Sequence, residues 1–79
     1  MVTVFRAHGL RFIIFVDDHE PAHIHVFGDG HIKIDLAGAK GAPEIVTIEG
    51  MKRNDVRRAM HIVAEQQQYL LSRWREIHG

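Results

Sequence analysis

The fold of this chain is decided by residues 23–36, which read HIHVFGDGHIKIDL. Apolar and polar residues alternate on both sides of a short loop with two glycines, which is typical of a hairpin of two half-buried antiparallel strands. A three-residue loop, Gly28 to Gly30, brings the isoleucines and the valine of the two strands onto one face. We therefore predict this register, with Gly30 in the left-handed conformation that three-residue hairpin loops favour.

The same register predicts the composition of the other face of the hairpin. Its cross-strand pairs are His23 with Asp35, His25 with Lys33, and Phe27 with His31. His23 and His25 are two residues apart on one strand, so their side chains point the same way, about 6–7 Å apart. The hairpin therefore presents one apolar face to a core and one histidine-bearing face away from it.

Outside the hairpin, the sequence predicts three further strands, over residues 2–6, 10–16 and 44–49, and then one long helix. From residue 52 to residue 77 apolar residues recur at alternating spacings of four and three, with Gln67 as the only polar break. A continuous helix of this length would measure about 39 Å, so one end should overhang a small sheet. The predicted fold is α+β: an antiparallel sheet of four to five strands packed on one long C-terminal helix.

Length and composition limit the kinds of protein this can be. The chain has 79 residues, 46% hydrophobic and 25% charged, which suits one soluble domain over residues 1–79, β-rich in residues 1–49. Ten basic and ten acidic residues cancel, so no overall positive field favours nucleic acid or membrane. There is no cysteine, and the longest apolar run, residues 12–16, is too short to span a membrane. With no signal-peptide pattern, we expect a cytoplasmic protein.

The strand at residues 10–16 has apolar side chains on both of its faces. Ile13 and Phe15 point away from the face that the hairpin predicts as core. They indicate either a surface that contacts a partner or a second copy, or a loop that folds over them.

The densest group of ionisable side chains lies in residues 17–26, which read DDHEPAHIHV. One interpretation is a divalent-metal site built on His23 and His25. The third ligand would then be His19, Asp17, Asp18 or Glu20, and Asp18 is the acid we assign. Zinc or a similar ion suits two imidazoles and a carboxylate.

A second interpretation needs no metal. His23, His25 or His19 would act as a general acid or base, oriented by Asp35 or by an acid of the loop, as in phosphodiester cleavage. Phosphates would be held by basic side chains, namely Lys33 and Arg57. A third interpretation is that these are solvated polar residues on the open face of a half-buried sheet. The other histidines, His8, His31, His61 and His78, have no neighbours in the sequence that suggest a site.

The chain resembles a family of small bacterial and archaeal proteins, domain-of-unknown-function family 4160. The resemblance rests on residues 3–6 (TVFR), 9–12 (GLRF) and 18–26 (DHEPAHIHV), and on a helix that contains residues 56–58 (VRR) and a late Trp74. The positions that match the core of the family are Arg6, Arg11, His19, Pro21, His23 and His25.

Genes of that family commonly stand beside a gene of family 2442, an arrangement that looks like a type II toxin–antitoxin pair. The resemblance therefore implies a toxin, whose partner is the antitoxin-like small protein. We expect a nuclease acting on RNA, with Arg6 and Arg11 among the substrate-binding residues and no cofactor required. The alternative is a non-catalytic protein- or metal-binding module that acts through an interface. A homodimer is expected in either case.

Overall fold

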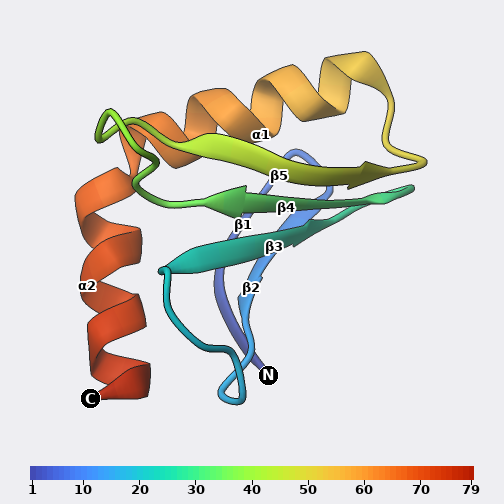
Figure 1. The fold of residues 1–79 in the computed structure, drawn as a ribbon. Coiled ribbons are helices and arrows are strands. Elements are labelled where there is room, and N and C mark those ends of the chain that lie inside the picture. The colour runs from blue at the N-terminus through green and yellow to red at the C-terminus, as the bar shows by residue number, and fades with distance from the viewer.

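Figure 1 shows the computed structural model of residues 1–79, an α+β fold with a five-stranded antiparallel sheet in the order β1-β2-β3-β4-β5. The strands are β1 (Val2–Ala7), β2 (Leu10–Ile14), β3 (His23–Phe27), β4 (His31–Asp35) and β5 (Glu44–Glu49), and the helices are α1 (Arg53–Glu65) and α2 (Gln67–His78). Each strand pairs with the next one in the chain, so the sheet is a meander with β1 and β5 as its edges. Neither helix is long and apolar enough to cross a membrane.

The predicted register of the β3–β4 hairpin is confirmed at all of its positions. The pairs are His23 with Asp35, Ile24 with Ile34, His25 with Lys33, Val26 with Ile32, and Phe27 with His31. The aliphatic residues of these pairs are fully buried in the core, namely Ile24, Val26, Ile32 and Ile34. The histidines therefore lie on the other face of the sheet, where the alternation places them.

The prediction that residue 30 is a glycine because its backbone is left-handed is wrong. Gly30 does not have a positive φ. In the turn between β1 and β2, by contrast, His8 (φ 54°) and Gly9 (φ 77°) are left-handed. Gly30 is needed for space instead, because a Cβ there would overlap the backbone from Glu49 to Met51. The tip of the β3–β4 hairpin thus packs against the chain that leaves β5.

The core lies between one face of the sheet and α1, and α2 closes it beside the ends of the strands (Figure 1). Its strand residues come from all strands except β5, and its helix residues come from both helices. The helix residues in the core are Ala59, Ile62, Val63, Leu70 and Trp74. The apolar spacing of the sequence therefore identified the packed side of the helical region correctly.

The single long helix predicted for residues 52–77 is wrong, because the helical region divides into α1 and α2 at Gln66. The side-chain amide of Gln67 donates hydrogen bonds to the carbonyl oxygens of Leu36 and Gly41, both at 2.7 Å. These bonds hold the start of α2 against the loop that follows β4. A straight helix of about 39 Å would exceed the longest dimension of the molecule, 33 Å. The turn lets α2 run down past the ends of the strands (Figure 1).

The second face of the sheet is covered in part by the loop between β2 and β3. Ile13 is only 1% exposed. The Phe15 ring turns back over this face and lies 4.8 Å from the His25 ring and 6.4 Å from the Phe27 ring, centre to centre. Ile13 is therefore buried and Phe15 is half-buried, and the two residues form no open apolar surface.

The role of Gly30 can be tested by adding one methyl group. We expect Gly30→Ala to lower the free energy of unfolding by about 2 kcal/mol or more, since the methyl group meets backbone that cannot move aside. The matched control is Gly38→Ala, where the methyl group meets only the flexible side chain of Glu44 and should cost less than about 1 kcal/mol. Urea unfolding followed by circular dichroism measures both. Equal losses in the two variants would contradict this account of the hairpin tip.

Candidate functional site

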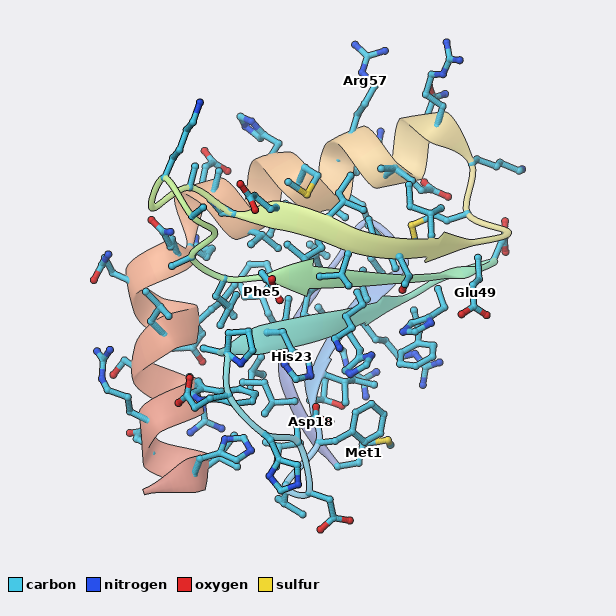
Figure 2. The ribbon with its side chains drawn as sticks, in the orientation of Figure 1. Met1, Phe5, Asp18, His23, Glu49 and Arg57 are labelled. Atoms are coloured by element: carbon cyan, nitrogen blue, oxygen red, sulfur yellow. The ribbon has the colours of Figure 1, made fainter.

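A polar hollow lies on the face of the sheet that points away from α1. It is lined by Asp17, Asp18, His19, Glu20, Pro21, His23, His25, Lys33 and Asp35. Figure 2 shows His23 and Asp18 on this side of the sheet, and Arg57 on the outer side of α1. The structure thus brings together all the predicted site residues of the hairpin and of the loop before it.

Two elements position the central side chains of this hollow. His23 and His25 project from β3, and Asp18 projects from the loop between β2 and β3. The carboxylate oxygen Oδ2 of Asp18 lies 3.0 Å from Nε2 of His23 and 3.4 Å from Nε2 of His25. One oxygen and two ring nitrogens therefore converge on a single point.

His23 is held on three sides. Its side chain is buried, and its Nδ1–H donates to the carbonyl oxygen of Pro21 at 2.8 Å. The Trp74 indole of α2 lies against the ring, 5.1 Å between centres, and its Nε1–H donates to Oε1 of Glu20 at 3.2 Å. Because Nδ1 carries the proton, Nε2 of a neutral His23 ring presents its lone pair to Asp18.

The ring of His25 is positioned by His31 of β4. The two rings are stacked with an angle of 11° between their planes, and Nδ1 of His25 lies 2.9 Å from Nε2 of His31. His31 was expected to have no companion, and this expectation is wrong. The hairpin register contained the signal, because His31 faces Phe27 and is thus diagonal to His25 on the same face.

Burial lowers the pKa of His25 below its ordinary value of 6.5, and the nearby His23, His31 and Lys33 lower it further against the opposing effect of Asp18. The neutral ring is therefore the dominant form at neutral pH. Nε2 of His25 and Oδ2 of Asp18 are both shielded from solvent and make no hydrogen bond. A neutral imidazole and a carboxylate oriented in this way are the forms that bind a metal ion.

Asp18, His23 and His25 are the residues of the chain that could together hold a metal ion. Each offers one ligand atom, and these atoms lie within 4.8 Å of one another. The other predicted site residues surround this group. His19 is exposed in the lining of the hollow, while Lys33 and Asp35 are half-buried on β4, opposite His25 and His23.

The predicted arginines lie outside the hollow. Arg6 and Arg11 face each other across β1 and β2. Arg11 pairs with Phe27, and its guanidinium lies 5.9 Å from the centre of that ring, so it shares the face of the histidines. Arg57 lies in a separate hollow with other polar residues of α1. Arg6 and Arg11 thus lie on the face of the histidines, Arg57 does not, and none of the three lines the hollow.

The fold and the hollow define a small α+β protein with a histidine–carboxylate site on the outer face of its sheet. The family model of a domain of unknown function, DUF4160, matches residues 9–75. Because the match covers most of the 79 residues, the chain belongs to this family, as the resemblance of its motifs indicated. Comparisons with curated proteins and with solved structures find no match.

The lowered pKa of His25 gives the stability of the fold a defined pH dependence. As the pH falls below 6.5, the unfolded chain binds a proton at this ring before the folded chain does, so His25 lowers the free energy of unfolding. We expect ring-proton NMR of chelator-treated protein to show a titration midpoint for His25 below 6.5. We also expect the melting temperature of His25→Asn to fall less than that of the native chain when the pH is lowered from about 7.5 to about 5.5. A midpoint at or above 6.5 would contradict the burial argument.

Proposed function

We propose that this chain is the toxin component of a type II toxin–antitoxin pair and that its polar hollow cleaves phosphodiester bonds in RNA. The observation that carries the proposal is the convergence of His19, His23 and His25 with several carboxylates in one open hollow. Few side-chain groups other than imidazoles exchange protons near neutral pH. The family resemblance supplies the cellular role, in the cytoplasm and with an antitoxin-like partner of family 2442.

RNA cleavage needs groups of the kind that this hollow provides. A base takes the proton of the attacking hydroxyl or water, whose oxygen then bonds to phosphorus. The bond from phosphorus to the leaving oxygen breaks, and an acid returns a proton to that oxygen. His19, His23, His25 and Asp35 are the residues we assign to this chemistry, and Lys33 supplies a positive charge beside it.

The face around the hollow also favours a nucleic-acid strand. Phe27 and His31 stack with an angle of 15° between their rings, and Arg11 lies over Phe27. Arg6 is the cross-strand neighbour of Arg11. Aromatic rings and guanidinium groups on a sheet face stack with bases and pair with phosphates, so this row suits single-stranded RNA. Arg57 would contact only a strand that reaches the other side of the molecule.

Induction in a bacterial culture tests this function directly. We expect the native chain to arrest growth, and His23→Ala/His25→Ala at equal expression to permit it, since the variant removes both central imidazoles. His61→Ala is the matched control, because His61 is exposed on α1 and should leave the arrest unchanged. Cleavage of total RNA by the purified proteins should follow the same order. Normal growth with the native chain, or arrest by the double variant, would contradict the proposed site.

A second candidate function is a non-catalytic binding module, and the edge strand β5 favours it. Every residue of β5 is exposed, including Ile45, Val46 and Ile48 at 41%, 46% and 49%. An apolar edge strand with no neighbour on one side is a surface on which another strand can pair. The expected homodimer or antitoxin complex would then form at β5.

The β5 surface is tested by a charged substitution that leaves the core intact. We expect Val46→Lys to convert a dimer, or a complex with the neighbouring gene product, into monomers at concentrations where the native chain stays associated. Light scattering after size-exclusion chromatography measures the mass, and Thr47→Lys on the same strand is a control without loss of apolar area. A native chain that is monomeric and does not bind the protein encoded by the neighbouring gene would count against the binding module.

A further inference from the structure

We propose that Asp18, His23 and His25 bind one divalent cation of the zinc class, through Oδ2 of the aspartate and Nε2 of each histidine. This inference deepens the proposed function by giving the hollow a cofactor. With the cation bound, His23 and His25 serve as its ligands, and His19 and Asp35 remain for the acid–base chemistry. Its ligand geometry stands by itself, whereas its role in cleavage rests on the proposed function. Four independent features of the hollow support it: the orientation of the rings, the shielded polar atoms, the ligand spacing and the charge.

The orientation of His23 is the first feature. Its Nδ1–H donates to the carbonyl oxygen of Pro21 at 2.8 Å, so Nε2 of the neutral ring points a lone pair at Oδ2 of Asp18, 3.0 Å away. Two lone pairs at this distance repel each other unless a positive charge lies between them. Metal-binding histidines are typically arranged in this way, with the distant ring nitrogen donating to a carbonyl oxygen.

His25 repeats this arrangement with a different partner. Its Nδ1 lies 2.9 Å from Nε2 of His31, and Nδ1 of His31 lies 4.0 Å from a carboxylate oxygen of Glu49. In the tautomer that places the proton of His31 on Nδ1, toward Glu49, His31 accepts at Nε2 and His25 donates from Nδ1. Nε2 of His25 then also presents a lone pair to Asp18.

The shielded atoms are suited to a cation. With Nδ1 of both rings protonated, a proton on Nε2 of His23 would satisfy the contact at 3.0 Å but would leave Nε2 of His25 without a partner. A buried polar atom without a partner costs about 1–3 kcal/mol. One cation between the three atoms satisfies all of them together.

The spacing of the ligand atoms fits a shared ion. Ligands about 2.0–2.1 Å from a tetrahedral zinc ion lie about 3.3–3.4 Å apart. Oδ2 of Asp18 lies 3.0 Å and 3.4 Å from the two ring nitrogens, and all three ligand atoms lie within 4.8 Å of one another. For tetrahedral spacing the two ring nitrogens, which lie within 4.8 Å of each other, would close to about 3.4 Å. Three protein ligands leave a fourth position for a water molecule or a substrate oxygen.

The charge of the hollow favours a cation beside a bound phosphate. Four carboxylates line it, from Asp17, Asp18, Glu20 and Asp35, against the single positive charge of Lys33. With neutral histidines the lining carries three net negative charges, which repel a phosphate. A divalent cation removes two of these charges and can bind the phosphate oxygen directly.

The donor set selects the class of ion. Two imidazoles and one carboxylate suit Zn²⁺, Fe²⁺ and related first-row ions, whereas Mg²⁺ and Ca²⁺ prefer sites built from oxygen alone. The chain has no cysteine, so no thiolate competes for the ion. Zn²⁺ is therefore the probe of choice.

The test uses the untagged 79-residue chain after treatment with a chelator. Its titration with Zn²⁺ is monitored by calorimetry, and its titration with Co²⁺ is monitored by visible absorption. We expect one Zn²⁺ per chain and a Co²⁺ spectrum typical of a nitrogen–oxygen site. Asp18→Asn keeps the shape of the side chain and removes its charge, and should weaken binding at least about tenfold. Asp17→Asn, a neighbouring acid of the same hollow outside the ligand set, is the matched control and should bind within about threefold of the native chain.

His25→Ala and His61→Ala form a second matched pair. We expect the first to abolish stoichiometric binding and the second to leave it unchanged, because His61 lies on the exposed side of α1. Circular dichroism verifies that each variant is folded. If His25→Ala unfolds, Asp18→Asn against Asp17→Asn decides the question. No stoichiometric binding by the native chain, or binding that is equal in the Asp18→Asn and Asp17→Asn variants, would overturn the proposal.

These results separate the metal site from the toxin function. Stoichiometric Zn²⁺ binding by a chain that does not arrest growth would leave the cation site standing and remove the nuclease. Growth arrest by a chain that binds no Zn²⁺ would overturn the cation site and leave the toxin.

Discussion

The structure depends on the register of the β3–β4 hairpin. Because residues alternate between the faces of a strand, burying Ile24 and Val26 in the core forces His23 and His25 onto the opposite face. A slip of one residue would bury the histidines and expose the core. The site and the core are therefore fixed by the same pairing. Gly30 protects it, because the hairpin tip packs directly on the backbone that leaves β5.

The register could be predicted from the sequence because it is a local property of residues 23–36. The helix break could not be predicted in this way. Gln67 is one polar residue in an apolar stripe, and the carbonyl groups that it binds belong to Leu36 and Gly41, about thirty residues earlier in the chain. The burial of Ile13 likewise depends on how separate segments pack, whereas the contact between His25 and His31 follows from the hairpin register and was missed. The spacing predicted that His23 and His25 point the same way, and Asp18 was the assigned acid among several candidates in the loop. The groups that orient the two rings were not predicted.

The outer face of the sheet has two chemically different regions. The hollow at Asp18 is negative and holds the two ordered imidazoles, while the row of Arg6, Arg11 and Phe27 is basic and aromatic. A strand of RNA could stack and pair on the second region while one phosphate reaches the first. A cation in the hollow would offset its negative charge, so that one RNA strand could contact both regions. The helix α2 supports this arrangement from the side, since Trp74 lies against His23 and binds Glu20.

The central claim is that Pro21 and His31 orient the two imidazoles so that both Nε2 atoms point at Asp18. The most direct measurement is nitrogen-15 NMR of the histidine rings, recorded on the ¹⁵N-labelled protein before and after addition of one equivalent of Zn²⁺. The account predicts that Nε2 of His23 and His25 moves to the metal-bound range while both Nδ1 atoms keep their protons, and that the ring of His61 does not change. Zn²⁺ bound through Nδ1, or no change in either ring, would contradict it.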